Sequence, residues 1–249
     1  IRKHSSTDEY NYLRGLAGSY QIGDFVLSAF YSHRSLDGIV ENDTITSIQK
    51  TGLHRTTREA ERRNALVMQV AGGNFTWQKD NLRIGITGIY YFFNRPYYAN
   101  TLDRKYAMYN LRGSDFYNMG VDYRFRWKRF VLSGEVAVDK NNSFAVLNAL
   151  NYNVSGNYKF MLIHRYYAHD YWAFFARSFS EGGYVQNENG WYIATEMTPF
   201  SKWKIFASVD FFSFPWWKYR VDSPSWGTDG MFQATYAPNS NLIMYFRYR

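Results

Sequence analysis

Residues 117–138 alternate between apolar and polar side chains on both sides of a short turn. Every second position is apolar or aromatic, and the positions between them include Asp122, Arg124, Arg126 and Glu135. A period of two predicts a β-hairpin whose two faces meet different environments. Burying such charges in the core of a soluble protein is energetically unfavourable. The pattern therefore favours membrane-spanning strands with an apolar outer face and a polar inner face.

The same alternation recurs along the chain and predicts twelve strands. The short connections between them fall at residues 21–24, 78–81, 128–129, 155–157, 199–202 and 237–240. The other connections fall at 40–64, 95–115, 140–143, 168–190 and 215–230. All of them are longer than the first set except 140–143, which has only four residues. Alternating short turns and long loops are typical of bacterial outer-membrane barrels.

We therefore predict an all-β fold: an antiparallel transmembrane β-barrel of the outer-membrane type, forming a single domain over residues 1–249. About 12 strands are visible, and the even-number rule suggests about 14 in a longer full protein, of which we expect this chain to be part. If the twelve strands close alone, residues 12–20 must pair with 242–249. A soluble sandwich or propeller is the alternative, but it would bury charge on nearly every strand.

The alternation also divides the side chains into two sets. The set predicted to face lipid comprises Tyr117, Met119, Val121, Tyr123, Phe125, Trp127, Leu132, Val136, Ile205, Val209, Leu242, Met244 and Phe246. The polar set predicted to face the lumen comprises Arg83, Asp122, Arg124, Arg126, Glu135, Lys159, Arg165, Glu196, Lys204, Asp210, Arg247 and Arg249. Basic residues outnumber acidic ones eight to four in the polar set. Such a lumen is either sealed by cross-strand ion pairs or conducts with a preference for anions.

The composition supports a membrane location. Aromatic residues make up 20% of the chain, and the rings of Tyr and Trp suit membrane–water interfaces. No apolar run approaches the ~20 residues of a spanning helix. The net charge of +8 favours an anionic surface, which lipopolysaccharide, anionic solutes or nucleic acid could supply. The partners we expect are outer-membrane lipids and lipopolysaccharide, together with other envelope proteins in a complex, and nothing else in this segment supports nucleic acid. The absence of cysteine excludes disulfides, thiol catalysis and thiolate metal sites.

Two catalytic arrangements are conceivable in the long loops. Outer-membrane phospholipases and deacylases use Ser–His pairs, a role open to His164 with Ser178 or Ser180. Omptin-like proteases use acidic pairs with a histidine at the rim, and the same loop carries the acidic residues Asp170, Glu181 and Glu188. His164 and His169 are five residues apart and do not share a strand face, so they predict no metal site. We predict a non-enzymatic protein without a cofactor.

Residues 56–59 match a helix capping box, with Glu59 three positions after Thr56. The sequence that follows, up to Arg63, can continue a short basic helix in the loop. That helix would either fold inward and constrict a pore or lie over the rim, and loop segments generally lie at surfaces.

Two stretches, 164–229 and 51–66, resemble the barrel portion of Bacteroidota outer-membrane proteins that contain helix-hairpin-helix domains. Residues 185–190 and 214–222 carry most of the resemblance. It implies an integral protein of the bacterial outer membrane, in which a signal peptide and small helical repeats precede the barrel. These repeats have no counterpart in the present sequence, so their DNA-binding role is not transferred to any residue.

Three functions remain open. We expect first a non-enzymatic outer-membrane barrel that is a subunit or scaffold of a cell-envelope complex. A porin-like channel for small anionic solutes is the alternative, and a surface hydrolase is a weaker third.

Overall fold

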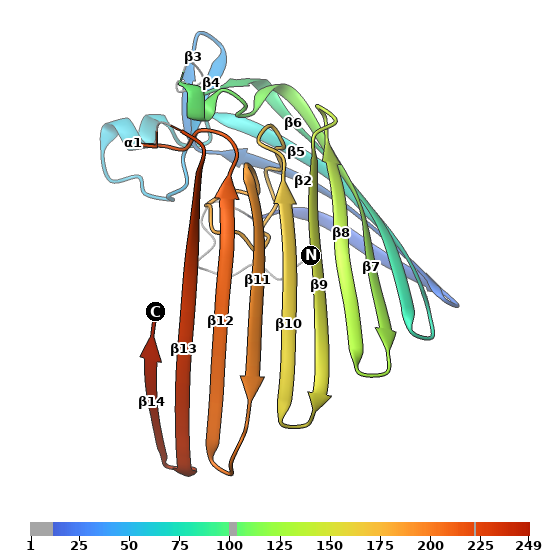
Figure 1. The fold of residues 1–249 in the computed structure, drawn as a ribbon. Helices are drawn as coiled ribbons and strands as arrows, with labels where there is room; N and C mark the ends of the chain where they lie inside the picture. Colours follow the sequence, from blue (N-terminus) through green and yellow to red (C-terminus); the bar gives the residue numbers. More distant parts are fainter. Residues whose placement is uncertain (1–11, 100–103, 222) are drawn as a thin grey trace.

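The computed structural model describes residues 12–99, 104–221 and 223–249, which form one 14-stranded β-sheet (Figure 1). Twelve strands neighbour one another in chain order, all antiparallel. Their bounds are β1 Gly15–Ile22, β2 Phe25–Leu36, β5 Leu66–Lys79, β6 Leu82–Tyr98, β7 Arg112–Trp127, β8 Phe130–Asp139, β9 Phe144–Ser155, β10 Tyr158–Tyr167, β11 Glu188–Met197, β12 Trp203–Phe214, β13 Ser225–Asn239 and β14 Leu242–Tyr248. The predicted antiparallel all-β fold is confirmed.

The remaining elements belong to the connections at one end of the sheet. Strands β3 (Gly38–Glu41) and β4 (Thr44–Ile48) form a hairpin that the sequence pattern did not predict. Helix α1 (Thr57–Glu61) and the 3-10 turn η1 (Lys105–Ala107) are short. Among the described residues, no helix is long and apolar enough to cross a membrane.

The short connections lie at one end of the sheet, which we call the turn end, and the longer ones lie at the other, the loop end (Figure 1). Tight hairpins need left-handed backbone angles. Asp80 and Lys128 supply them with φ of 49° and 50°, and Gly23 supplies one with φ of 54°.

Several strands extend further toward the loop end than the sequence pattern predicts. The predicted connection 95–115 is shortened because β6 continues to Tyr98 and β7 begins at Arg112. Pro96 lies inside β6, at a register shift between Phe92 and Tyr97. A proline can remain in a strand at such an irregularity, since no regular ladder hydrogen bond is lost there.

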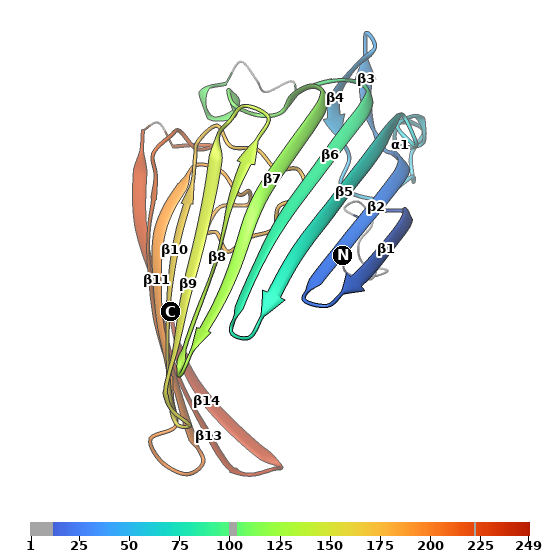
Figure 2. The same cartoon turned by 90° about the vertical axis from the view of Figure 1, so that its right-hand side faces the viewer.

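The sheet is strongly curved but not closed (Figure 2). Within the described residues, β1 pairs only with β2 and β14 only with β13. The pairing between 12–20 and 242–249 that closure by twelve strands would require is therefore not formed.

Residues 168–187, which we call the inward segment, fold back from the loop end onto one face of the sheet. We call this the inner face, and the opposite one the outer face. The larger hydrophobic core lies here: Trp172, Phe174 and Phe175 pack against a cluster that includes Tyr91 and Phe116. Because these rings come from the sheet and from the inward segment, the core fixes the segment inside the curve of the sheet.

Candidate functional site

The strand register places the two predicted sets of side chains on opposite faces. All twelve polar residues predicted to face the lumen lie on the inner face; for example, Asp122 is paired with Glu135 and Lys159 with Glu196. All thirteen apolar residues predicted to face lipid lie on the outer face, where Val121 is paired with Val136. On these strands the named charged residues and the named apolar residues are therefore on opposite faces.

Most charges on the inner face are paired across strands. The Arg83 guanidinium donates to the Asp122 carboxylate, and Lys159 and Lys204 share Glu196 at 3.3 and 2.7 Å. One further ion pair joins Arg249 to Asp229, and the Arg247 guanidinium donates a hydrogen bond to the Gln233 amide oxygen at 2.8 Å. These pairs are solvent-exposed or partly so, and pairs of that kind contribute little stability individually, about 0–1 kcal/mol.

Arg165 forms the one fully buried ion-pair cluster among the described residues. Its guanidinium donates to Glu188 on β11 and, at 2.8 and 3.0 Å, to both carboxylate oxygens of Asp210 on β12. Arg165 and Glu188 are 0% exposed and Asp210 is 6% exposed. Gly190 is required opposite Arg165, because a Cβ atom there would come within 2.6 Å of the guanidinium carbon. Glu188, one of the three loop acids of the protease hypothesis, is therefore a buried structural carboxylate.

The end of the inward segment is anchored to this cluster. The backbone N–H groups of Glu181 and Gly182 both donate to the Glu188 carboxylate, at 2.9 to 3.1 Å. The Tyr167 hydroxyl donates to the Phe179 carbonyl at 2.8 Å. The inner face of the sheet thus carries the charge cluster and also binds the end of the inward segment.

The start of the inward segment is anchored at a second place. The backbone N–H of Trp172 donates to Asp139 at 2.9 Å, and the Asn118 amide donates to the Trp172 carbonyl at 2.9 Å. Burial raises the pKa of the Tyr171 phenol, and the nearby Glu135 carboxylate raises it further. Hydrogen bonds and apolar contacts therefore fix the segment at both ends.

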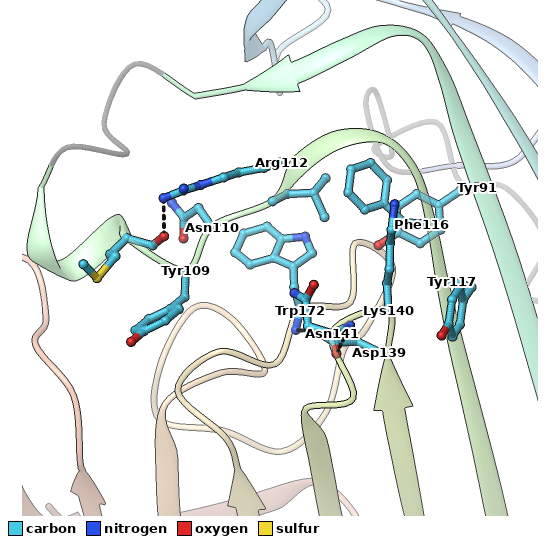
Figure 3. Close-up of a pocket in the computed structure, with 12 residues that line it drawn as sticks. Tyr91, Tyr109, Asn110, Arg112, Phe116, Tyr117, Asp139, Lys140, Asn141 and Trp172 are labelled. Atoms are coloured by element: carbon cyan, nitrogen blue, oxygen red, sulfur yellow. Dashed lines mark hydrogen bonds between the residues drawn. The ribbon is translucent and has the colours of Figure 1, made fainter.

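A cavity of about 320 Å³ lies at the loop end between three connections (Figure 3). It is lined by the 108–112 stretch, by residues 139–141 and by Trp172. Arg112 donates to the Met108 carbonyl at 2.6 Å, and Lys140 is bonded to Asp115, so both cations already have partners. The residues that line this cavity come from separate parts of the sequence. The alternation pattern within one strand therefore could not predict it.

The residues proposed for hydrolysis are not brought together. His164 lies on the outer face with its ring against Trp191, at a centroid separation of 4.4 Å. Ser178 is bonded to the hydroxyl of Tyr167 on the inner face, and Ser180 donates to the Gly182 carbonyl. The conceivable Ser–His pair is therefore not formed by His164 with either serine.

The acidic group of the protease hypothesis is also dispersed. The Glu181 side chain is exposed, whereas that of Glu188 is buried against Arg165. The ring of His169 lies against Tyr109 and Trp216, with centroids 4.7 and 5.3 Å away. Across 12–99, 104–221 and 223–249, no group of three His, Cys, Asp or Glu side chains is arranged to hold a metal ion.

The capping box predicted at Thr56 and Glu59 is confirmed. The backbone N–H of Glu59 donates to the Thr56 hydroxyl at 3.2 Å, and the Thr56 N–H donates back to the Glu59 carboxylate at 3.2 Å. Helix α1 ends at Glu61 and has no buried residue, and it lies at the loop end (Figure 1). Its exposure fits the position over the rim, whereas residues 168–187 pack against the inner face.

No protein-family model matches the chain, and no curated protein sequence is significantly similar to it. Among solved structures, it is similar to the outer-membrane expressed OmpT of Vibrio cholerae (12% identity, TM-score 0.41), covering 93% of this chain and 64% of that one. It is also similar to the toluene transporter TbuX of Ralstonia pickettii (9% identity, TM-score 0.31), covering 93% and 77%. The chain thus spans less than two thirds of the first protein's length. With both TM-scores below 0.5, the fold assignment rests on the sheet itself.

Proposed function

We propose that the protein is an integral β-barrel protein of the bacterial outer membrane. The supporting observation is the outer face, where each of the twelve strands in the main path presents at least one large exposed apolar side chain. Met119, Trp127 and Phe246 are 58%, 55% and 63% exposed. An apolar surface of this extent is unfavourable in water and matches the lipid-facing band of a membrane barrel.

Within the membrane, we propose that it acts as a non-enzymatic scaffold or subunit of a cell-envelope complex. The observation that carries this proposal is the inward segment, which occupies the interior and is bonded to the wall through Asp139, Asn118 and Glu188. A fixed segment packed against the loop-end part of the inner face favours a structural role over free passage of solutes. The broad aromatic outer face and the loop-end connections leave large surfaces for partner proteins.

A porin-like channel for small anionic solutes is the second candidate. It is favoured by Arg124 and Arg126, which lie on the inner face and form no ion pair or side-chain hydrogen bond within the described part of the chain. Unpaired cations on a water-filled wall attract anions.

Planar-bilayer recordings on the full-length protein separate the two functions. The scaffold predicts no steady current, and it also predicts that envelope proteins copurify from native membranes. A steady anion-selective current that falls in Arg124→Glu or Arg126→Glu, with no effect of the turn variant Arg129→Glu, would overturn the scaffold and support the channel. A protein that always elutes alone would count against the complex.

A further inference from the structure

Arg124 and Arg126 lie two residues apart on β7, on the inner face near the turn end. Alternate residues of a strand point to the same side and are about 7 Å apart along it. Arg83 is directly opposite Arg124 on β6, but its guanidinium is already bonded to Asp122 and to the Thr76 hydroxyl. Two guanidinium groups therefore remain exposed beside a third that is neutralised.

A cavity of about 110 Å³ is formed at this place. Its lining comprises Gln78, Asp80, Asn81, Leu82, Arg83, Arg124 and Arg126. Asp80 is the only acid in that lining, and it makes no ion pair in the described residues, so positive charge exceeds negative charge here. Gln78 and Asn81 add amide groups that can donate hydrogen bonds.

We propose that this cavity, the β7 arginine site, binds a small tetrahedral oxyanion, with inorganic phosphate or a phosphate monoester group as the ligand class. A planar guanidinium binds two oxygens of such an anion at once, and the two unpaired guanidinium groups outweigh the single Asp80 carboxylate in the lining. The volume of about 110 Å³ accommodates a phosphate group. This inference goes beyond the proposed function, because binding requires neither conduction nor a partner protein.

A phosphate group could come from a free solute or from a lipid headgroup. The site lies on the inner face, opposite the apolar outer face, so a dissolved anion reaches it without leaving water. We therefore assign the ligand to the free solute.

The test is titration calorimetry with inorganic phosphate at low ionic strength, using the full-length protein in zwitterionic nanodiscs. We expect Arg124→Gln and Arg126→Gln each to weaken phosphate binding roughly tenfold, because each removes a charge-assisted donor pair. Arg129→Gln is the matched control: it removes the same charge at the same end, where Arg129 is bonded to the Val154 carbonyl. It should bind phosphate as the wild type does.

The double variant Arg124→Lys/Arg126→Lys keeps both charges but loses the forked geometry, and it should also bind more weakly than wild type. Equal binding by all variants would overturn the site, as would equal weakening by Arg129→Gln. If the arginine substitutions changed retention on phosphatidylglycerol vesicles and not phosphate binding, the assignment to a soluble anion would be wrong. Tryptophan emission and circular dichroism establish that each variant is folded, so lost binding reports on the site.

Discussion

Replacing Arg165 by methionine tests whether the buried ion cluster fixes the inward segment. The substitution leaves Glu188 and Asp210, 0% and 6% exposed, without their cation. Breaking a buried pair by removing one partner costs ~3–5 kcal/mol. Because Glu188 also accepts from Glu181 and Gly182, we expect the end of the inward segment to loosen together with the loss of stability.

The assay is urea unfolding of the protein refolded in lipid vesicles, followed by tryptophan emission, together with limited proteolysis of the native state. Lys204→Met is the matched control: this cation also lies on the inner face and is bonded to a carboxylate, but it is exposed. Its loss should change the free energy of unfolding by only about 0–1 kcal/mol. Arg165→Met should also speed cleavage within residues 168–187, whereas Lys204→Met should not.

The triple variant Arg165→Met/Glu188→Gln/Asp210→Asn removes the uncompensated charges and should recover much of the lost stability. If Arg165→Met were as stable as Lys204→Met, or if the triple variant were no better than the single one, the reasoning from burial would be refuted.

Three further predictions concern the two faces and the rim. Gly190→Ala should destabilise by ~1–3 kcal/mol in the same urea assay, because its Cβ would displace the Arg165 guanidinium, whereas Gly88→Ala has open space around it and should be neutral. Val136→Arg, on the outer face, should destabilise the protein by about 2–4 kcal/mol in vesicles if it lies near the bilayer midplane; an unchanged unfolding midpoint would argue against lipid there. Backbone donors, first that of Arg55, lower the pKa of Glu59 from its usual 4.5, so α1 capping is present above that value and lost as pH falls through the lowered one. The protection of the Thr56 amide, measured as its exchange rate relative to the intrinsic rate at the same pH, should then fall in acid in the wild type and change less with pH in Glu59→Gln.

The alternation of side chains was sufficient to predict the antiparallel all-β fold and, on the clearly alternating strands, which side chains share a face. Arg124 and Trp127, for instance, are separated by strand geometry alone, which has a fixed period. The partners of Arg165 could not be predicted, because they come from strands 23 and 45 residues away and depend on the register of three strands. The extension of β6 past Pro96 was missed because the pattern gives no sign of the irregularity that accommodates a proline.

The inward segment was predicted only as a connection. Residues 168–187 have no strand period, and their place is set by single contacts such as that of the Trp172 backbone with Asp139. The one available signal was the presence of polar residues, such as Asn118 and Asp139, near the loop end of the inner face. They hydrogen-bond the backbone of the inward segment at Trp172.

The central claim is that the outer face contacts lipid while the inner face contacts water. The chain has no cysteine, so single-cysteine variants can carry one spin label each without further changes. Labels at Leu132 and Val209 on the outer face, and at Ser133 and Ser208 on the inner face, should be compared in vesicles for collision with oxygen and with a water-soluble nickel chelate. Oxygen should dominate at Leu132 and Val209, and the nickel chelate at Ser133 and Ser208. Equal nickel access at neighbouring positions, or the reverse order, would contradict the assignment of the two faces.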